Sequence, residues 1–517
     1  YNGDTSNPTF FDNFDTYLSS AVTSSPTSHF ITTTSGKATS INGNNFSQDG
    51  VMHFSGDYST GIQVASVNIA AGGPWSTTGS RSLVRADNKG NGYIQLDGSH
   101  SYGMKLSGQK LYVSDEDYNA KTASYMANNG LILISGSYDT GITSGTTNDG
   151  SPASQSYGSS AGIAKLKEAK WDSKKTIFNN GRIYVGGYNN SGILLESIYD
   201  DTVTNNGTIT IDKAYNLFNN PSSVTYSNAV AESNAGIRVQ SYATTDTATG
   251  KDIVGINKGT ININNGSGNV GIYAFDVQSG SIPSSTGHYI AGDNTNVISI
   301  NGGSNVGMMA QDDSGSTTNF KTIIRNSGTI NVGGKGSIGM YTNDKASFAE
   351  QNGGTITASS NNVGVVNNGT FDFKGGTIKA TGVNSVGVYS KNGTNSTTNI
   401  GSGTPNSATL NVSDGGVGLY ADDGSKQTLK GLNATVSGTD KAGSILFYNI
   451  PSTSGGTAGK FDVTNNPGTA SIGAYSFAFY TNDNLFSGGT TFAQFLDKWI
   501  NTGTGNGIAL TMNPGSS

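Results

Sequence analysis

Hydrophobic and polar residues alternate with a period of two along many short segments of the chain. Thr208–Ile211, Thr260–Ile263 and Thr370–Phe373 show this pattern without interruption. A period of two places successive side chains on opposite faces of a β-strand. The alternation therefore predicts strands that bury Ile, Val and Phe and expose Thr, Asn and Asp.

Two kinds of strand recur as a pair through most of the sequence. The first kind has a Gly-Thr-Ile pattern and occurs at 207–209, 259–261, 328–330, 354–356 and 376–378. The second kind has a Val-Gly-Xaa-Tyr pattern and occurs at 270–273, 306–309, 338–341, 363–366, 386–389 and 417–420. Weaker copies lie upstream at 60–64, 102–106, 181–185 and 192–194. Such repetition predicts a solenoid in which each pair belongs to one coil.

The spacing within a pair is nearly constant, whereas the spacing between pairs is not. Gly271 follows Gly259 by 12 residues and Gly364 follows Gly354 by 10, but successive second-strand glycines lie 23 to 36 residues apart. Because a solenoid tolerates insertions at its turns, we expect the extra residues in loops that project outward. A smallest coil of about 23 residues with two or three short strands predicts an all-β, right-handed parallel β-helix with loop insertions and capping segments.

Glycine and asparagine precede most of the first strands. Glycine is expected to supply the positive φ of a sharp corner, and asparagine tolerates the left-handed region better than other residues. The same Asn-Gly pairs also suit β-hairpin turns. The regular repeat favours parallel stacking over hairpins.

Three segments are predicted: a capping segment at 1–40, the β-helix at 41–480, and a C-terminal extension with a short amphipathic helix at 481–517. The cap is inferred from the helix-like spacing of Phe10, Phe11, Phe14, Tyr17 and Leu18. The C-terminal helix is inferred from the i, i+3, i+4, i+7 spacing of Phe492, Phe495, Leu496 and Trp499. We expect this helix either to pack on the solenoid or to bind a partner. Residues 163–171 are interpreted as a lateral decoration or a strand region.

Composition narrows the class of protein. The 517 residues include 74 Gly, 10 Pro, 12% charged residues, 33% hydrophobic residues and no Cys. A solenoid has little interior per residue, so this hydrophobic content is sufficient for a core. A net charge of −6 argues against nucleic acids and anionic membranes as partners. No apolar run reaches the roughly 18 residues expected of a membrane helix.

Asn-rich Gly-Thr-Ile strands that alternate with Val-Gly-Xaa-Tyr strands resemble the passenger region of type V (type Va) autotransporter adhesins. The resemblance is to the very large fusobacterial outer-membrane adhesins related to RadD, and it is clear over residues 170–480. It implies a location on the surface of a bacterial outer membrane after export through a C-terminal barrel. The chain ends at Pro514-Gly515-Ser516-Ser517 without such a barrel, so we expect it to be a piece of a longer passenger.

Acidic residues follow the second strand in several coils: Asp276, Asp312, Asp313, Asp344, Asp422 and Asp423. If the coils stack in register, these carboxylates project from one edge about 4.8 Å apart. Like charges so close repel unless solvent, a cation or a basic ligand compensates. One interpretation is that each Asp accepts hydrogen bonds from its own turn. The other is a ligand-binding acidic edge for Ca²⁺ or for the cationic side chains of a partner.

Aromatic residues offer a second candidate. Tyr273, Tyr341, Tyr389 and Tyr420 share one position in their coils. Met309 and Val366 replace them in other coils, which favours a position inside the core; an outward position would instead suit stacking on sugars. A second hypothetical ligand-binding surface is an aromatic loop with Tyr215, Phe218 and Tyr226.

The sequence gives little support to catalysis. Asp313-Ser314-Gly315 resembles a serine-protease nucleophile segment, but it follows a strand where each coil turns, and none of the four histidines lies in a recognisable base segment. Those histidines also lack metal-ligand spacing, so we expect no cofactor and no metal site.

We therefore expect a monomeric, non-enzymatic adhesin that binds a protein or glycan receptor on host cells or other bacteria. Two alternatives stay open: a polysaccharide-active β-helix enzyme, either a lyase or a glycoside hydrolase, and a passive structural stalk. An enzyme would need a pair of carboxylates, or calcium with a basic residue, at a suitable distance.

Overall fold

The computed structural model consists of short β-strands, and no helix occurs among the residues that it describes. Those residues are 30–33, 40–41, 45–48, 50–54, 60–65, 85–98, 101–107, 125–136, 161–165, 176–196, 201–213, 231–241, 253–276, 288–312, 320–391, 396–449, 459–463, 467–481, 500–501 and 508–516. The chain forms two compact units, Tyr1–Asn269 and Val270–Ser517. Within this described part, nothing is helical and apolar over a length that could cross a membrane.

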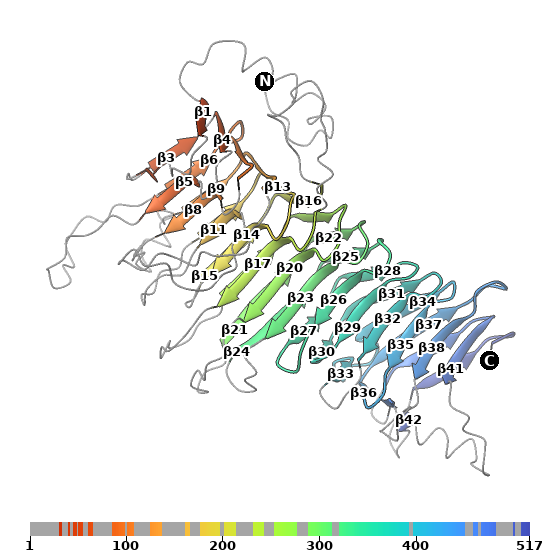
Figure 1. The fold of residues 1–517 in the computed structure, drawn as a ribbon. Helices are drawn as coiled ribbons and strands as arrows, with labels where there is room; N and C mark the ends of the chain where they lie inside the picture. The colour runs from red at the N-terminus through yellow and green to blue at the C-terminus, as the bar shows by residue number, and fades with distance from the viewer. Residues whose placement is uncertain are drawn as a thin grey trace, which may run out of the picture. The chain divides into compact units, whose positions relative to one another are not determined.

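In the first unit, three parallel sheets run along the coils, and each coil contributes one strand to each sheet (Figure 1). Sheet A contains β1 (Phe30–Thr33), β4 (Val51–Phe54), β7 (Tyr93–Leu96), β10 (Leu131–Ile134), β13 (Arg182–Val185), β16 (Thr208–Ile211) and β19 (Thr260–Ile263). Sheet B contains β2 (Ser40–Ile41), β5 (Thr60–Ala65), β8 (Tyr102–Ser107), β11 (Ala161–Lys165), β14 (Ser191–Glu196) and β17 (Ala235–Ser241). Sheet C contains β3 (Asn45–Gln48), β6 (Arg85–Asn88), β9 (Tyr125–Asn128), β12 (Thr176–Asn179), β15 (Asp201–Asn205) and β18 (Ile253–Asn257).

The second unit repeats this plan. Sheet A contains β22 (Val297–Ile300), β25 (Thr329–Val332), β28 (Thr355–Ala358), β31 (Gly376–Thr381), β34 (Ala408–Ser413), β37 (Leu432–Ser437), β40 (Thr469–Ile472) and β43 (Ala509–Met512). Sheet B contains β20 (Val270–Asp276), β23 (Val306–Asp312), β26 (Ile338–Thr342), β29 (Val363–Asn367), β32 (Val386–Ser390), β35 (Val417–Ala421), β38 (Ser444–Asn449) and β41 (Ser476–Thr481). Sheet C contains β21 (His288–Asn294), β24 (Phe320–Asn326), β27 (Phe348–Gln351), β30 (Thr370–Phe373), β33 (Thr397–Ile400), β36 (Lys426–Leu429), β39 (Lys460–Asp462) and β42 (Ile500–Asn501).

The core of each coil is a set of columns in which equivalent residues lie directly above one another. In sheet A, Ile209 pairs with Ile261 in the first unit, and Ile330 pairs with Ile356 in the second. All four side chains are fully buried. Each buried Ile contributes about 1.5–3 kcal/mol relative to exposure to water. The predicted parallel β-helix is confirmed, with three strands per coil.

Buried amides form a hydrogen-bonded ladder at the corner between sheets C and A. In the first unit, Asn88 donates to Asn128, Asn128 to Asn179, Asn179 to Asn205 and Asn205 to Asn257, at 2.7–2.8 Å. Successive members are 40, 51, 26 and 52 residues apart in sequence. The ladder thus keeps its geometry while the intervening loops vary in length, as a solenoid allows.

The glycine of the Val-Gly-Xaa-Tyr pattern is required by a close approach. A Cβ on Gly307 would lie 2.6 Å from the carbonyl oxygen of Gly339 and 3.0 Å from Cγ2 of Ile330 in sheet A. The next residue, Met308, is also buried, so two successive residues of β23 face inward. This doubling shifts the alternation of the strand by one position, and Met309 therefore faces outward.

The described residues cover only parts of the predicted cap and C-terminal extension. Phe30–Thr33, within the predicted cap, is a strand of sheet A, and Ser40–Ile41, which crosses its boundary at 40, is a strand of sheet B. Ala161–Lys165 is strand β11, which agrees with a strand region for the start of 163–171. The aromatic residues at 10–18 and 492–499 lie outside the described residues. The boundaries at 40 and 480 stay predictions.

Candidate binding surface

The tyrosines of the Val-Gly-Xaa-Tyr pattern face outward, so the preference for a core position is wrong. In register along sheet B of the second unit the position is occupied by Tyr273, Met309, Tyr341, Val366, Tyr389, Tyr420, Tyr448 and Tyr480. The burial pattern of β26 and β32 leaves this position partly exposed, because two buried residues precede it. Tyr448 and Tyr480 were missed by the sequence reasoning because no glycine follows Ile445 or Phe477.

The tyrosine rings stack mainly on one another. Tyr420 lies 4.9 Å from Tyr448 with an interplanar angle of 11°, and Tyr448 lies 5.4 Å from Tyr480 at 11°. Tyr389 meets Tyr420 in a T-shaped contact at 4.8 Å. Both faces of Tyr448 are therefore covered by neighbours. A pyranose stacks on an open aromatic face, so Tyr448 offers the edge of its ring rather than a platform for sugars.

The tyrosine hydroxyls are held by polar residues at the same edge of the sheet. Tyr389 donates to Oδ2 of Asp422 at 2.7 Å, and Tyr341 donates to Oδ1 of Asn343 at 2.7 Å. Burial, followed by the charges of Asp422 and the neighbouring Tyr448, raises the pKa of Tyr420 to about 12. Burial, and then the hydrogen bond to Asp422, raises the pKa of Tyr389 above its ordinary value. These rings are thus anchored and neutral at physiological pH.

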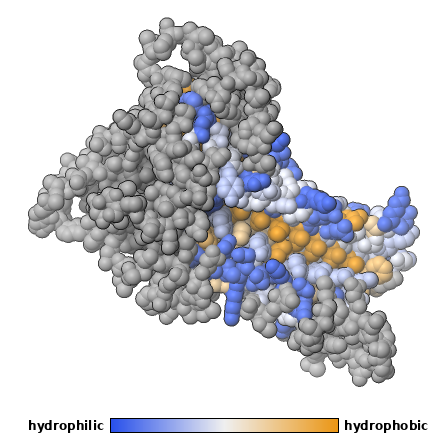
Figure 2. All heavy atoms as spheres, viewed as in Figure 1, coloured by the Kyte–Doolittle hydropathy of each residue, from blue (hydrophilic) through white to orange (hydrophobic). Residues whose placement is uncertain are grey.

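A row of aliphatic side chains runs beside the tyrosine row. Its members pair in register and are partly exposed; they are the first residues of five strands and the second residue of β38: Val306, Ile338, Val363, Val386, Val417 and Ile445. Figure 2 shows hydrophobic side chains gathered in a continuous band over strands β23 to β35. We call this aliphatic row, together with Met309, Tyr341, Val366, Tyr389, Tyr420 and Tyr448, the apolar face. Neither row contains a charged residue.

The predicted acidic edge is only partly brought together. Asp276 and Asp312 are register partners, but they are 3% and 5% exposed and do not project into solvent as expected. Oδ2 of Asp344 accepts a hydrogen bond from the backbone N–H of Asp312 at 2.6 Å. Asp313 lies outside the described residues. The acidic edge therefore lacks the continuous row of exposed carboxylates that stacking alone suggested.

Two of the remaining acids of this edge, Asp344 and Asp422, accept hydrogen bonds from their own turns, whereas Oδ1 of Asp423 is buried without a hydrogen-bond partner among the described residues. Asp344 accepts from Ala346 N at 3.0 Å and from Ser347 Oγ at 2.8 Å. Asp422 accepts from the backbone N–H of Asp423 at 2.9 Å, besides the Tyr389 hydroxyl. This arrangement agrees with the turn interpretation. Ligand binding by Asp344, Asp422 and Asp423 stays a hypothesis.

The structure describes only some of the residues of the other candidate binding sites. Tyr215, Phe218 and Tyr226 of the aromatic loop lie outside the described residues. Within the described residues, no group of three or more His, Asp or Glu side chains is arranged to hold a metal ion.

One histidine of the first unit contacts a carboxylate. His53 Nε2 lies 2.6 Å from Oδ2 of Asp97, and Oδ1 of Asp97 accepts hydrogen bonds from Gln95 and Ser135. His53 is 8% exposed and Gln95 is fully buried. Since three side chains share this partly exposed carboxylate, it serves as a hydrogen-bond acceptor within the fold.

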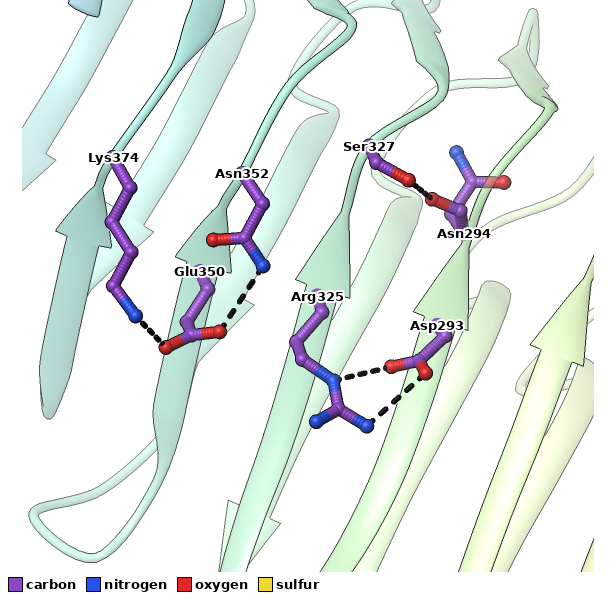
Figure 3. Close-up of polar contacts among 7 residues, drawn as sticks. All are labelled: Asp293, Asn294, Arg325, Ser327, Glu350, Asn352 and Lys374. Carbon is purple, nitrogen blue, oxygen red and sulfur yellow. Dashed lines mark hydrogen bonds and ion pairs between the residues drawn. The ribbon is translucent and has the colours of Figure 1, made fainter. Parts of the chain in front are cut away.

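The outer row of sheet C in the second unit carries alternating charges (Figure 3). Arg325 donates from Nε and one terminal nitrogen to the two carboxylate oxygens of Asp293, at 2.7 and 3.1 Å. Two coils further, Lys374 forms an ion pair with Glu350. Because these pairs are partly exposed, each contributes little to stability, about 0–1 kcal/mol. The charged outer face of sheet C contrasts with the uncharged apolar face of sheet B in the same coils.

Residues 115–278 match the protein family described as BigA third pectate lyase-like domain. The match covers strands from both units and agrees with the parallel β-helix found here. No curated protein matches this sequence.

Proposed function

We propose that this chain is a non-enzymatic adhesin of the bacterial cell surface, part of the passenger of a type V autotransporter at the outer membrane. It attaches the bacterium to host cells or to other bacteria through a protein or glycan receptor. The observation that carries the proposal is the constant register of the coils despite loops of different lengths. Such a scaffold holds outward rows and loops in fixed positions, which suits an extended binding surface.

The similarity to a BigA pectate lyase-like domain supports a β-helix of this kind on the cell surface. The carboxylates described above support a role without catalysis, because Asp97, Asp344 and Asp422 are all engaged as hydrogen-bond acceptors within the fold. Adhesion by the acidic edge or by the loops would need no such group to act as a general acid or base.

The test is binding of the purified chain to intact host cells and to intact bacteria of several species. We expect saturable binding, and competition by free arginine, galactosides or EDTA then distinguishes an acidic edge, a lectin-like surface and a calcium-dependent site. A variant with Asp344→Asn and Asp422→Asn tests the acidic edge, and Asp293→Asn on the outer face of sheet C is the matched control. Absence of saturable binding to every cell type would contradict the adhesin and favour a passive stalk.

The pectate lyase-like description of the matching family favours one competing function, a polysaccharide-active enzyme. Incubation with pectate and other acidic polysaccharides, with and without Ca²⁺, decides between the two. Release of unsaturated or reducing sugar ends by the wild-type chain would overturn the non-enzymatic proposal.

A further inference from the structure

We propose that the apolar face is a self-association surface. It pairs with the same face of a second copy, and the two β-helices lie side by side and run in the same direction. This association goes beyond receptor binding, because it would gather adhesins on one cell.

The apolar face has the chemistry of an interaction surface. Its two rows are uncharged over six successive strands, β23 to β38, and all their members except the buried Val366 are partly exposed. Sheets normally bury an apolar face against another layer. A contiguous exposed apolar patch on a protein surface marks an interaction site.

The apolar face suits a second copy of the chain better than a sugar or a cationic ligand. Stacked rings such as Tyr448 have no open face for a sugar. Their outward edges carry the positive part of the ring quadrupole, which disfavours a cationic ligand. Two flat sheet faces, in contrast, pack well at about 10 Å. A second copy offers such a face with the same length and the same spacing between strands.

The two unlike rows of the apolar face determine whether the paired β-helices run parallel or antiparallel. A twofold axis parallel to the helix axis places the aliphatic row of one copy over the tyrosine row of the other, for example Val386 over Tyr389 of the second copy. A twofold axis perpendicular to the helix axis places tyrosine edges against tyrosine edges, where like parts of the quadrupole meet. The pattern of two unlike rows is therefore self-complementary when the copies are parallel.

The area of the apolar face determines how tightly two copies associate. Six strands at about 4.8 Å span roughly 25–30 Å, and the rows lie about 10 Å apart, since each tyrosine-row residue follows its aliphatic-row residue by three positions along the strand. The buried area is then on the order of 300–500 Å² per copy, below the roughly 800 Å² of a standard stable interface. The chain is thus a monomer in dilute solution and pairs when anchored neighbours raise its local concentration.

Spin labels test both the pairing and its direction, and the absence of cysteine makes single labels simple. Lys335→Cys, Val383→Cys and Lys441→Cys place exposed labels in equivalent turns before β26, β32 and β38. We measure the dipolar distance between copies in concentrated full-length protein. Parallel pairing gives the same distance at all three positions. Antiparallel pairing about β32 gives a minimum at Val383→Cys and adds an axial offset of about 20 Å between the labels at the other two positions, which lengthens both distances and would overturn the proposal.

A matched pair of variants tests the surface. Val417→Lys places a charge in the aliphatic row and should weaken association at least about tenfold, because an unpaired charge would be buried. Thr409→Lys places the same charge on the outer face of sheet A, in the preceding strand of the same coil, and should leave association unchanged. Equal loss in both variants, or no dipolar coupling between wild-type copies, would refute self-association.

A lipid surface is the other occupant of such a face that can be tested directly. Co-sedimentation of the wild-type chain, but not Val417→Lys, with uncharged phosphatidylcholine vesicles would assign the face to lipid and overturn the proposal. These measurements need no receptor, so their failure is distinguishable from a failure of the adhesin assay.

Discussion

The stacking of coils predicts that two adjacent glycines respond very differently to the same substitution. Gly354 ends the turn before β28 with a φ of 62°, whereas Gly353 precedes it without a positive φ. A Cβ on Gly354 would lie 1.9 Å from the carbonyl oxygen of Gly328 in the preceding coil. A Cβ on Gly353 would meet no atom closer than 3.9 Å. Gly354→Ala should therefore destabilise this coil, and Gly353→Ala is its control.

The magnitude for Gly354→Ala has two parts. A left-handed conformation costs an alanine about 1–2 kcal/mol. Displacing the carbonyl of Gly328 costs about 1–3 kcal/mol as overpacking, and this carbonyl also accepts the 2.9 Å hydrogen bond from Thr355 N. The expected loss is about 3 kcal/mol. Gly353→Ala should lie between no change and a gain of about 1 kcal/mol from reduced freedom of the unfolded chain.

Hydrogen exchange is the appropriate assay, because a solenoid opens locally and one global free energy is not well defined for it. In Gly354→Ala, amides of β25 and β28 should exchange on the order of 100-fold faster, which corresponds to about 3 kcal/mol. In Gly353→Ala they should be unchanged or slower. Equal exchange in the two variants would refute the close approach between coils as the reason for glycine at this corner.

Three further outcomes follow from the contacts described. Asn205→Ala removes one amide from the middle of the buried ladder. It should lower the free energy of local opening by about 1–3 kcal/mol, measured by hydrogen exchange. An unchanged exchange rate would contradict a structural role for the ladder. Because the folded-state pKa of Tyr420 is about 12 against about 10 for free tyrosine, its contribution to stability should be complete below pH 10 and lost as the pH rises through 12. Asp422→Asn should lower this pKa, measured as the difference in tyrosinate absorbance between each protein and its Tyr420→Phe form. Arg325→Ala breaks the partly exposed pair with Asp293 and should lower the free energy of local opening of β21 and β24 by less than about 1 kcal/mol, measured by hydrogen exchange, with a smaller difference at high salt.

The inward positions could be predicted from the sequence because burial imposes a simple period on them. Ile209, Ile261, Ile330 and Ile356 lie in the predicted column and are fully buried. The register of the two repeated strands followed from this column, since a slip of one residue would expose it.

The third strand of each coil was not identified as a repeat, because its residues vary more than those of the other two. Thr370–Phe373 has a clear alternation, but Thr397–Ile400 in the next coil is mainly polar. A signal was present in the buried amide at the end of these strands, as in Asn294 and Asn326, which are bonded at 2.8 Å. Asparagine at these corners was assigned to left-handed turns, and this is true of Asn406 but not of the ladder residues.

The corner glycines were predicted correctly in position, but the reason was incomplete. Gly259 has no positive φ; a Cβ there would instead lie 2.0 Å from the carbonyl oxygen of Gly207. Close contact between coils is a long-range effect and leaves no local pattern that distinguishes it from a turn. The same limit explains the tyrosines, because the doubled inward position at Gly307 and Met308 depends on the space beside Ile330 in another sheet.

The outward positions carry the functional information because folding constrains them least. In the coil that contains β31 and β32, the outer face of sheet A presents Thr377 and Lys379, while the outer face of sheet B presents Val386 and Tyr389. All four are partly exposed. The backbone hydrogen bonds of a strand in either sheet would form equally well if its outward side chains were polar. Coil formation alone therefore gives no reason for an uncharged apolar face on one sheet only. An uncharged, partly exposed surface that continues from coil to coil is explained if that surface is buried when the protein is at work, and this is what pairing of the apolar faces would provide.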